Sequence, residues 1–328
     1  MSLNKVLFSA ALLLGGFSAA AQNIDKIINA AEVERIEKIL SADNMQGRKT
    51  FTPGIDKAAD FIAGEFAKSK LQFFGSGKNY FQEFDMTKAK PLEVKGMLDN
   101  ETLSIDNIAA NTTLEEINIT SLKDYEVVVV KKEDDFSKIV FPVFDLNKNV
   151  IILVDTAHTR RFKGIQRFTG NAKAPASVSQ IFILTTNLTP AAINLHIKNQ
   201  MTLQHLKNVV GVLPGTTKKD EFVVFAGHYD HLGIGKPDSK MDSIYNGAND
   251  DAAGTTAVMM LAKYFSAQKE KNERTIIFVA FTAEEIGGFG SRYFSKQLAP
   301  DKVMAMFNIE MIGTESKWGK KLSIYHRV

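Results

Sequence analysis

Two kinds of apolar periodicity distinguish the first 205 residues. Residues 30–70 place apolar side chains three and four positions apart, in AAEVERIEKILS and GIDKAADFIAGEFAKSKL, and this spacing predicts two amphipathic helices. The connection ADNMQGRKTFTPG is rich in turn residues. Residues 80–205 instead carry short β-branched or aromatic runs, such as YEVVVVKK, NVIILVDT and SQIFILTT, which predict strands. Within them, TPAAINLHIKN is compatible with one short helix.

From about residue 206 the pattern alternates between strands and helices. The runs KNVVGVLPG, EFVVFAG, RTIIFVAFT and VMAMFNIEMIG predict strands, whereas DDAAGTTAVMMLAKYFSAQKEK predicts a long helix and EEIGGFGSRYFSKQL a turn followed by a helix. Such alternation is typical of an α/β fold, with a mixed, mostly parallel sheet sandwiched by helices. The β-rich segment before it is then an insertion.

The first residues have the pattern of a signal peptide. A short basic segment, MSLNK, precedes the apolar run VLFSAALLLGGFSAAA, and Ala19-Ala20-Ala21 fits a cleavage site. The alternative is a membrane anchor, but the run is short beside the roughly 20 residues that a span needs. We therefore expect a signal peptide at 1–21, a secreted or periplasmic protein, and no stable membrane anchor after cleavage.

Composition narrows the classes of protein further. A chain of 328 residues is long enough for about two domains, or for one large domain with an insertion. The formal net charge of +3, without a long basic run, argues against nucleic-acid binding. The sequence has no cysteine, so neither disulfides nor a lipidated N-terminal cysteine can form. Stability must come from the core or from bound metal.

Side chains that bind metals follow the predicted strands. Sites in open α/β sheets gather at the carboxyl ends of the strands. Each of these residues has an ordinary structural explanation, as a helix N-terminal acid or a packed histidine. Together, however, adjacent acids beside buried strands need a compensating positive charge, and no lysine or arginine is near them in sequence. The residues are His228, Asp230, Asp250, Asp251, Glu284, Glu285 and Glu310.

A metal ion could supply that charge. One imidazole with several carboxylates fits zinc, with manganese and cobalt as alternatives. Two bridged metals could polarise a carbonyl and activate a water molecule together. A carboxylate that is not a ligand could then take the proton from that water, and the adjacent pair Glu284-Glu285 suits this division of roles.

Four segments resemble one known family. GHYDHLG, IYNGANDDAAGTTAVMMLA, RTIIFVAFTAEEIGGFGSRYF and MFNIEMIG are similar, in order and spacing, to the co-catalytic di-zinc peptidases of the M28 family. The resemblance covers residues 206–314 and extends more weakly to 30–86. It implies a zinc exopeptidase fold of the phosphorylase/hydrolase-like type, in which 22–90 and 206–328 form the peptidase domain. The insertion 91–205 stands where many members carry a protease-associated domain.

The resemblance also implies a role for each matching residue. His228 would bind one zinc, Asp250 would bridge two, and Glu285 would bind the second. Glu284 would be the general base and later the proton donor to the leaving amine. Asp230 would hydrogen-bond the free nitrogen of His228.

Glu310 and the final histidine ligand depart from the family pattern, and His231 has no ligand role in it. Glu310 stands where many members have an aspartate ligand to the first zinc, and it is counted here as a metal ligand. His231 has no ligand role in the pattern and is interpreted as a crevice or surface residue. The family's final histidine ligand comes several dozen residues after the position of Glu310. The sequence printed ends at Val328, and His326, in a predicted strand, is not expected to replace that ligand.

We therefore expect a fragment, a truncated gene product or a degenerate paralogue that binds one zinc or fewer tightly, instead of two. The predicted function is a secreted zinc-dependent exopeptidase, most simply an aminopeptidase acting on peptides or proteins. Three alternatives stay open: a non-catalytic binding protein on the same fold, a carboxypeptidase, and a glutaminyl-cyclase-like transferase. The sequence determines neither the residue preference nor the oligomeric state.

Overall fold

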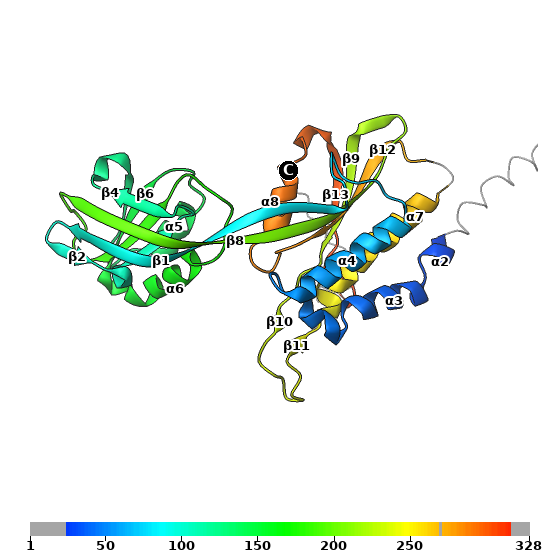
Figure 1. The fold of residues 1–328 in the computed structure, drawn as a ribbon, viewed down its shortest axis with the longest axis horizontal. Helices are drawn as coiled ribbons and strands as arrows, with labels where there is room; N and C mark the ends of the chain where they lie inside the picture. The colour runs from blue at the N-terminus through cyan, green and yellow to red at the C-terminus, as the bar shows by residue number, and fades with distance from the viewer. Residues whose placement is uncertain (1–23, 269–270, 316–328) are drawn as a thin grey trace, which may run out of the picture. The chain divides into compact units, whose positions relative to one another are not determined.

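The computed structural model describes residues 24–268 and 271–315. The expected signal peptide at 1–21 and the candidate ligand His326 lie outside these residues. The described chain forms two compact units (Figure 1). Unit 1 takes the residues up to Phe84 and from Leu206 onward, and unit 2 takes Asp85–His205. Within the described ranges, no helix combines the length and apolarity needed to cross a membrane.

The sheet of unit 1 is mixed and mostly parallel, as predicted. Its order is β13, β9, β12 and the end of β8, with parallel pairing of β13 to β9 and of β9 to β12, and antiparallel pairing of β12 to β8. Because β9, β12 and β13 run in the same direction, their carboxyl ends meet at one edge of the sheet. The strands are β8 (Ile193–Leu213), β9 (Lys218–His228), β12 (Arg274–Phe281) and β13 (Val303–Asn308).

Helices cover both faces of this sheet. Along β12, Ile276, Phe278 and Ala280 pack against three helices on one face. Ile277 and Val279, which point the opposite way, pack with Phe294 of the helix on the other face. The α/β sandwich predicted from the alternation is thus confirmed. The three helices are α3 (Ala30–Leu40), α4 (Pro53–Lys68) and α7 (Ala253–Ala267), and the single one is α8 (Phe289–Ser295).

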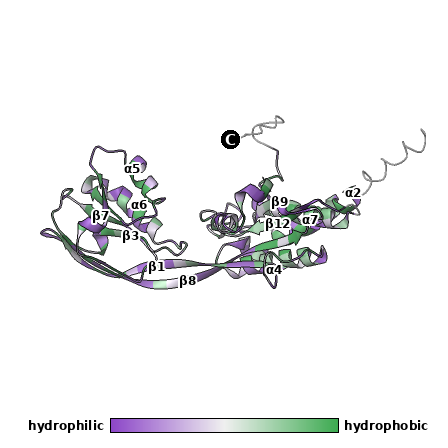
Figure 2. Cartoon of the chain, turned by 90° about the horizontal axis from the view of Figure 1, so that it is seen from above, coloured by the Kyte–Doolittle hydropathy of each residue, from purple (hydrophilic) through white to green (hydrophobic). Residues whose placement is uncertain are grey.

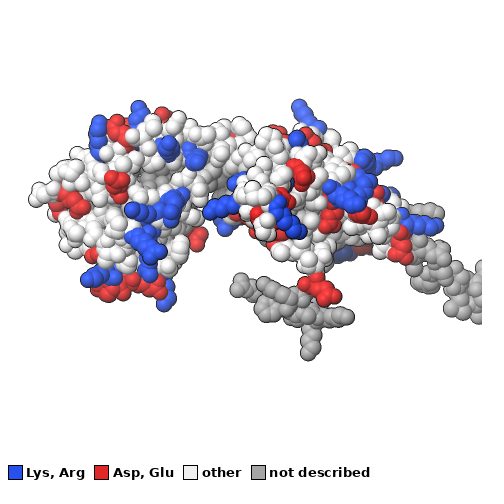
Figure 3. Space-filling view, turned by 90° about the horizontal axis from the view of Figure 1, so that it is seen from below, with Lys and Arg blue, Asp and Glu red and all other residues white. Residues whose placement is uncertain are grey.

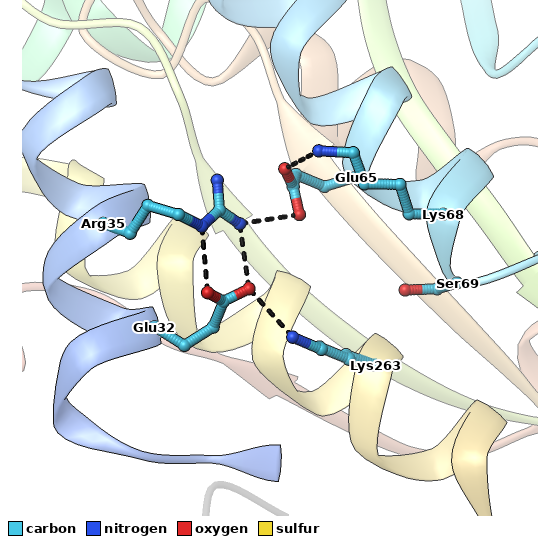
Figure 4. Close-up of a pocket in the computed structure, with 6 residues that line it drawn as sticks. All are labelled: Glu32, Arg35, Glu65, Lys68, Ser69 and Lys263. Carbon is cyan, nitrogen blue, oxygen red and sulfur yellow. Dashed lines mark hydrogen bonds and ion pairs between the residues drawn. The ribbon is translucent and has the colours of Figure 1, made fainter.

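An ion-pair network ties α3, α4 and α7 together (Figure 4). Arg35 donates to both carboxylate oxygens of Glu32 at 2.9 Å and to Glu65 at 3.0 Å. Lys263 reaches Glu32 and Lys68 reaches Glu65, both at 2.8 Å. The hydrogen bonds from Arg35 and Lys263 lower the pKa of Glu32 to about 2. The network holds the three helices together.

Short elements connect these parts of unit 1. The turn η2 precedes α4, the pair β10–β11 forms a small hairpin, and η6 leads into α7. Their bounds, with those of the remaining two elements of the unit, are α2 (Ile24–Ile27), η2 (Asp43–Arg48), β10 (Gly233–Ile234), β11 (Ile244–Tyr245), η6 (Ala248–Ala252) and η7 (Pro300–Lys302).

Unit 2 is built on a second sheet, in the order β3, β7, β6 and β5, with β5, β6 and β7 parallel. The strands expected here are present, but helices α5 and α6 are not suggested by the strand pattern; Figure 2 shows both hydrophobic and hydrophilic residues on each. The bounds are β1 (Phe81–Leu98), β2 (Glu101–Leu103), η3 (Ile105–Asn107), β3 (Ile108–Asn111), β4 (Glu116–Ile119), η4 (Leu122–Asp124), β5 (Glu126–Val130), α5 (Phe136–Val143), β6 (Val150–Asp155), η5 (Thr156–His158), α6 (Thr159–Thr169) and β7 (Gln180–Thr185).

The expected short helix in TPAAINLHIKN is wrong, because this segment opens β8. Ile193, Leu195 and Ile197 are buried while the residues between them are more exposed, which is the period of a strand. Leu195 pairs with Ile119 and Ile197 with Ile117 on β4. Charged side chains of both signs are interspersed on the face of each unit seen in Figure 3.

Candidate metal centre

The predicted ligands converge at the carboxyl edge of the unit 1 sheet. His228 is the last residue of β9 and pairs with Phe281, the last residue of β12. Glu284 and Glu285 follow β12 by three and four positions, and Glu310 follows the end of β13 by two. Parallel pairing therefore brings together groups that are dozens of residues apart in the chain.

A first group that could hold a metal consists of His228, Asp250 and Glu310, whose ligand atoms all lie within 4.8 Å of one another. The Nε2 atom of His228 lies 3.2 Å from Oδ1 of Asp250. That contact does not have hydrogen-bond geometry, and the buried Nε2 has no hydrogen-bond partner among the described residues. A buried polar atom without a partner calls for an explanation. A cation between the imidazole and the carboxylate would provide one, so this donor set fits a zinc ion.

The other ring nitrogen of His228 is held by Asp230. Nδ1 lies 3.1 Å from the backbone carbonyl oxygen of Asp230 and 3.7 Å from its carboxylate. The Asp230 carboxylate also accepts hydrogen bonds from the backbone N–H groups of Glu284, at 3.0 Å, and Glu285, at 3.2 Å. The hydroxyl of Thr50 donates to it at 3.0 Å. Asp230 therefore orients both the histidine and the loop that carries the glutamate pair.

A second group consists of His231, Asp250 and Glu285, again with ligand atoms within 4.8 Å of one another. Nδ1 of His231 lies 2.8 Å from Oε1 of Glu285 and 3.9 Å from Oδ2 of Asp250. Asp250 is common to both groups, which is the arrangement that a bridging carboxylate requires. His231 is nearly buried and faces this group. The only sequence signal for it is that a second histidine follows the same strand end.

Asp251, next to the shared carboxylate, is fully buried and points elsewhere. Its carboxylate accepts hydrogen bonds from the backbone N–H groups of His228, Gly254 and Met311, at 3.0–3.1 Å. Burial raises its pKa to about 7, against the opposing effect of His228 and these hydrogen bonds. Asp251 thus joins the end of β9, the start of α7 and the segment after β13, and these three elements hold the first group in place.

Arg48 is a buried residue that the sequence reasoning did not identify. Its side chain is completely inaccessible and donates four hydrogen bonds, all to backbone carbonyl oxygens. Nε donates to Tyr229 at 2.9 Å, Nη1 to Leu40 at 2.6 Å and to Asn246 at 2.7 Å, and Nη2 to Gly247 at 2.9 Å. Burial lowers its pKa to about 10, so it stays charged at neutral pH.

The site retains an excess of negative charge despite Arg48. Burial disfavours protonation of His228, but Asp230, Asp251 and Glu284 outweigh that effect and raise its pKa to about 9. Burial also raises the pKa of Glu284, with His228 opposing the shift and the neighbouring carboxylates adding to it. Both groups hold protons more tightly than usual, and the excess of negative charge around them favours their protonated forms. A bound cation would compensate the same negative charge.

Comparisons with known proteins agree with this chemistry. Residues 208–321 match the sequence profile of Peptidase family M28, so the resemblance predicted from the motifs is confirmed. A probable zinc metalloprotease of Pyrenophora tritici-repentis is 32% identical over 111 residues, which are 33% of this chain and 25% of that protein. Aminopeptidase YwaD of Bacillus subtilis is 29% identical over 128 residues, 38% of this chain and 25% of that protein.

The chain thus aligns with only about a quarter of the length of these curated relatives. Among solved structures, an aminopeptidase from Aneurinibacillus sp. strain AM-1 aligns with a TM-score of 0.46 at 20% identity, covering 90% of this chain and 73% of that one.

Proposed function

We propose, from the match of residues 208–321 to Peptidase family M28, that this protein is a zinc-dependent exopeptidase, most simply an aminopeptidase. The observation that carries the proposal is the Nε2 atom of His228, which faces Asp250 and has no hydrogen-bond partner in the part of the chain that the structure describes. Asp250 is the carboxylate shared by two groups of potential ligands. The name of the YwaD relative supports aminopeptidase over the other exopeptidase classes.

His228, Asp250 and Glu310 would hold the first zinc, and Asp250 and Glu285 would contribute to a second. Zinc in such a site supplies Lewis acidity and lowers the pKa of a bound water to about 7. Carboxylates beside it could also hold the free amine of a substrate, which is the feature that an aminopeptidase must recognise.

Glu284 is the proposed general base. Its backbone is fixed by Asp230, while its side chain is exposed enough to reach a substrate and a water molecule. The raised pKa of Glu284 makes it a stronger base than an ordinary carboxylate. In the proposed reaction, Glu284 takes a proton from the attacking water and passes it to the leaving amine. Asp230 is the positioning residue for both His228 and Glu284.

The location of the protein and its domain plan are also proposals. The sequence of residues 1–21 supports export through a cleaved signal peptide, so that the enzyme would meet extracellular or periplasmic peptides. The peptidase domain would consist of 22–90 and 206–328. The segment 91–205 would be an insertion of the protease-associated type.

The test is the turnover of aminoacyl-p-nitroanilides by the purified chain. We expect activity that a chelator abolishes and added zinc restores. The matched control is Glu284→Gln, which keeps the shape of the side chain and loses the base. It should lower kcat by about 10²–10⁴-fold with unchanged zinc content.

The outcomes separate the alternatives. Zinc binding without turnover of any peptide would favour a non-catalytic binding protein. Cleavage of N-acetylated peptides from their carboxyl end would favour a carboxypeptidase, and release of ammonia from N-terminal glutamine would favour a cyclase. If Glu284→Gln lost zinc together with activity, the roles assigned to Glu284 and Glu285 would be exchanged.

A further inference from the structure

We infer that His231 is a ligand of the second zinc, together with Asp250 and Glu285. The inference rests on the proposed metallopeptidase function and adds a residue that the family pattern does not use. It gives both metals chemically equivalent protein ligands: one histidine, one glutamate and the shared Asp250. Three protein ligands with a fourth position free for water is the usual arrangement of catalytic zinc.

The distances suit an ion between these side chains. Zinc bonds of 2.0–2.2 Å in tetrahedral geometry place two ligand atoms roughly 3.4 Å apart. Nδ1 of His231 is 2.8 Å from Oε1 of Glu285 and 3.9 Å from Oδ2 of Asp250, so the observed separations lie on either side of that value. Shifts of about half an ångström in the side chains would open the hydrogen bond and admit the metal between them.

The backbone around His231 is built to hold its ring at this place. The N–H of His231 donates to the carbonyl oxygen of Arg48 at 3.2 Å, and the side chain is only 10% exposed. Gly247, at φ +62°, lies against the ring, and a Cβ there would come within 2.6 Å of its Cγ and Cδ2 atoms. The ring is therefore confined between Gly247 and Glu285, whereas a surface histidine would need no such fit.

Ligand chemistry favours coordination over a purely structural hydrogen bond. Among the described residues, the group around the second metal position consists of His231 and two carboxylates, Asp250 and Glu285. Zinc favours nitrogen and sulfur donors over carboxylates alone, so the imidazole makes this group a better zinc site. A histidine that merely oriented Glu285 would be a positioning residue, and its loss would lower the affinity for the second zinc by about 10–100-fold. Loss of a direct ligand should lower that affinity further, so the size of the loss separates a positioning residue from a ligand.

The absence of cysteine from the sequence provides a direct spectroscopic test. In His231→Cys, the thiol at position 231 is the only one in the full chain. With Co²⁺ added, we expect a thiolate-to-cobalt charge-transfer band in the near ultraviolet, which appears only if residue 231 binds the metal. The control is His205→Cys, at an exposed position of unit 2 paired with Asp85, which should give no such band.

Zinc titration calorimetry of the full chain supplies the second readout. With His231 as a ligand, wild type should bind two zinc ions, in place of the one or fewer expected from the sequence alone. His231→Ala should keep the first ion and lower the affinity for the second by more than about 100-fold. His231→Gln can still donate a hydrogen bond to Glu285 but is a poor ligand, so it should behave like the alanine variant. If His231→Gln bound the second zinc as wild type does, or if His231→Cys gave no cobalt band, the inference would be overturned.

Failure of the proposed function has a different signature. If wild type bound no zinc at all, and His228→Ala changed nothing, the metallopeptidase proposal itself would fail. If a first zinc bound in a His228-dependent manner while every change at position 231 was silent, only the inference about His231 would fail.

Discussion

Arg48→Met should destabilise unit 1 and loosen the metal centre at the same time. The Arg48 guanidinium connects the loop after β9, through Tyr229, with the segment before η6, through Asn246 and Gly247. These two segments carry the candidate ligands His231 and Asp250. Methionine has a similar length and no hydrogen-bond donor, so the substitution removes the connection without leaving a large cavity.

The expected magnitude follows from the contacts. Four carbonyl oxygens lose a charged donor, and a hydrogen bond to a charged group is worth about 1.5–3 kcal/mol. Relief of the desolvation of the buried guanidinium offsets part of that sum. A buried carbonyl oxygen left without a donor costs about 1–3 kcal/mol, so after the offset we expect a net loss of about 3–5 kcal/mol of stability. Arg48→Lys keeps the charge but not the planar fork, and should lie between wild type and methionine.

Because the chain has two compact units, a signal averaged over the whole chain would mix two transitions. Hydrogen exchange followed by mass spectrometry reports each peptide separately, and the opening free energy of the peptides from residues 221–231 is the quantity to compare. Arg35→Met is the matched control. Its side chain is 37% exposed in the network of Figure 4, and its loss should cost about 1 kcal/mol or less. Zinc affinity should fall in Arg48→Met and not in Arg35→Met. Equal effects of the two substitutions would refute the reasoning.

Three further predictions concern the metal centre. Asp250→Ala should release both zinc ions, because the shared carboxylate screens their mutual repulsion, whereas Glu285→Ala should release mainly one. Mass spectrometry counts the metal ions bound to each variant. If Asp250→Ala retained two zinc ions, Asp250 would not be the bridging ligand. Zinc affinity should rise about tenfold per pH unit below about pH 9, because the metal must displace the proton that His228 holds up to that pH. A chelator competition from about pH 6 to 8 measures this slope. An affinity that does not change with pH would contradict the prediction. In Gly247→Ala the new Cβ would meet the backbone carbonyl oxygen of Asp250 as well as the ring of His231, so this variant should weaken zinc binding. Gly64→Ala, whose Cβ meets nothing within 4 Å among the described residues, should not, and calorimetry on both variants compares them.

The sequence by itself determined which side chains stand at the strand ends. Apolar runs such as EFVVFAG and RTIIFVAFT mark buried strands, and parallel strands end at a common edge. The sequence alone therefore predicts that His228 and Glu285 lie close together. The sequence also predicts the helices of unit 1, because their apolar residues repeat every three to four positions. The prediction of a short helix in TPAAINLHIKN was wrong. This segment has the period of two of a strand, but its residues have mixed helix and strand propensities.

Only the tertiary structure decided how the charges of the site are compensated. Arg48 lies 181 positions from Tyr229 in the chain, and a contact over that distance leaves no periodic signature in either segment. The same holds for His231, whose partner Glu285 is 54 positions away and whose space depends on a missing Cβ at Gly247. Local patterns record burial and direction along one element, because those depend on neighbouring residues. The pairing of buried polar groups depends on which loops meet, and that is fixed only when the whole unit packs.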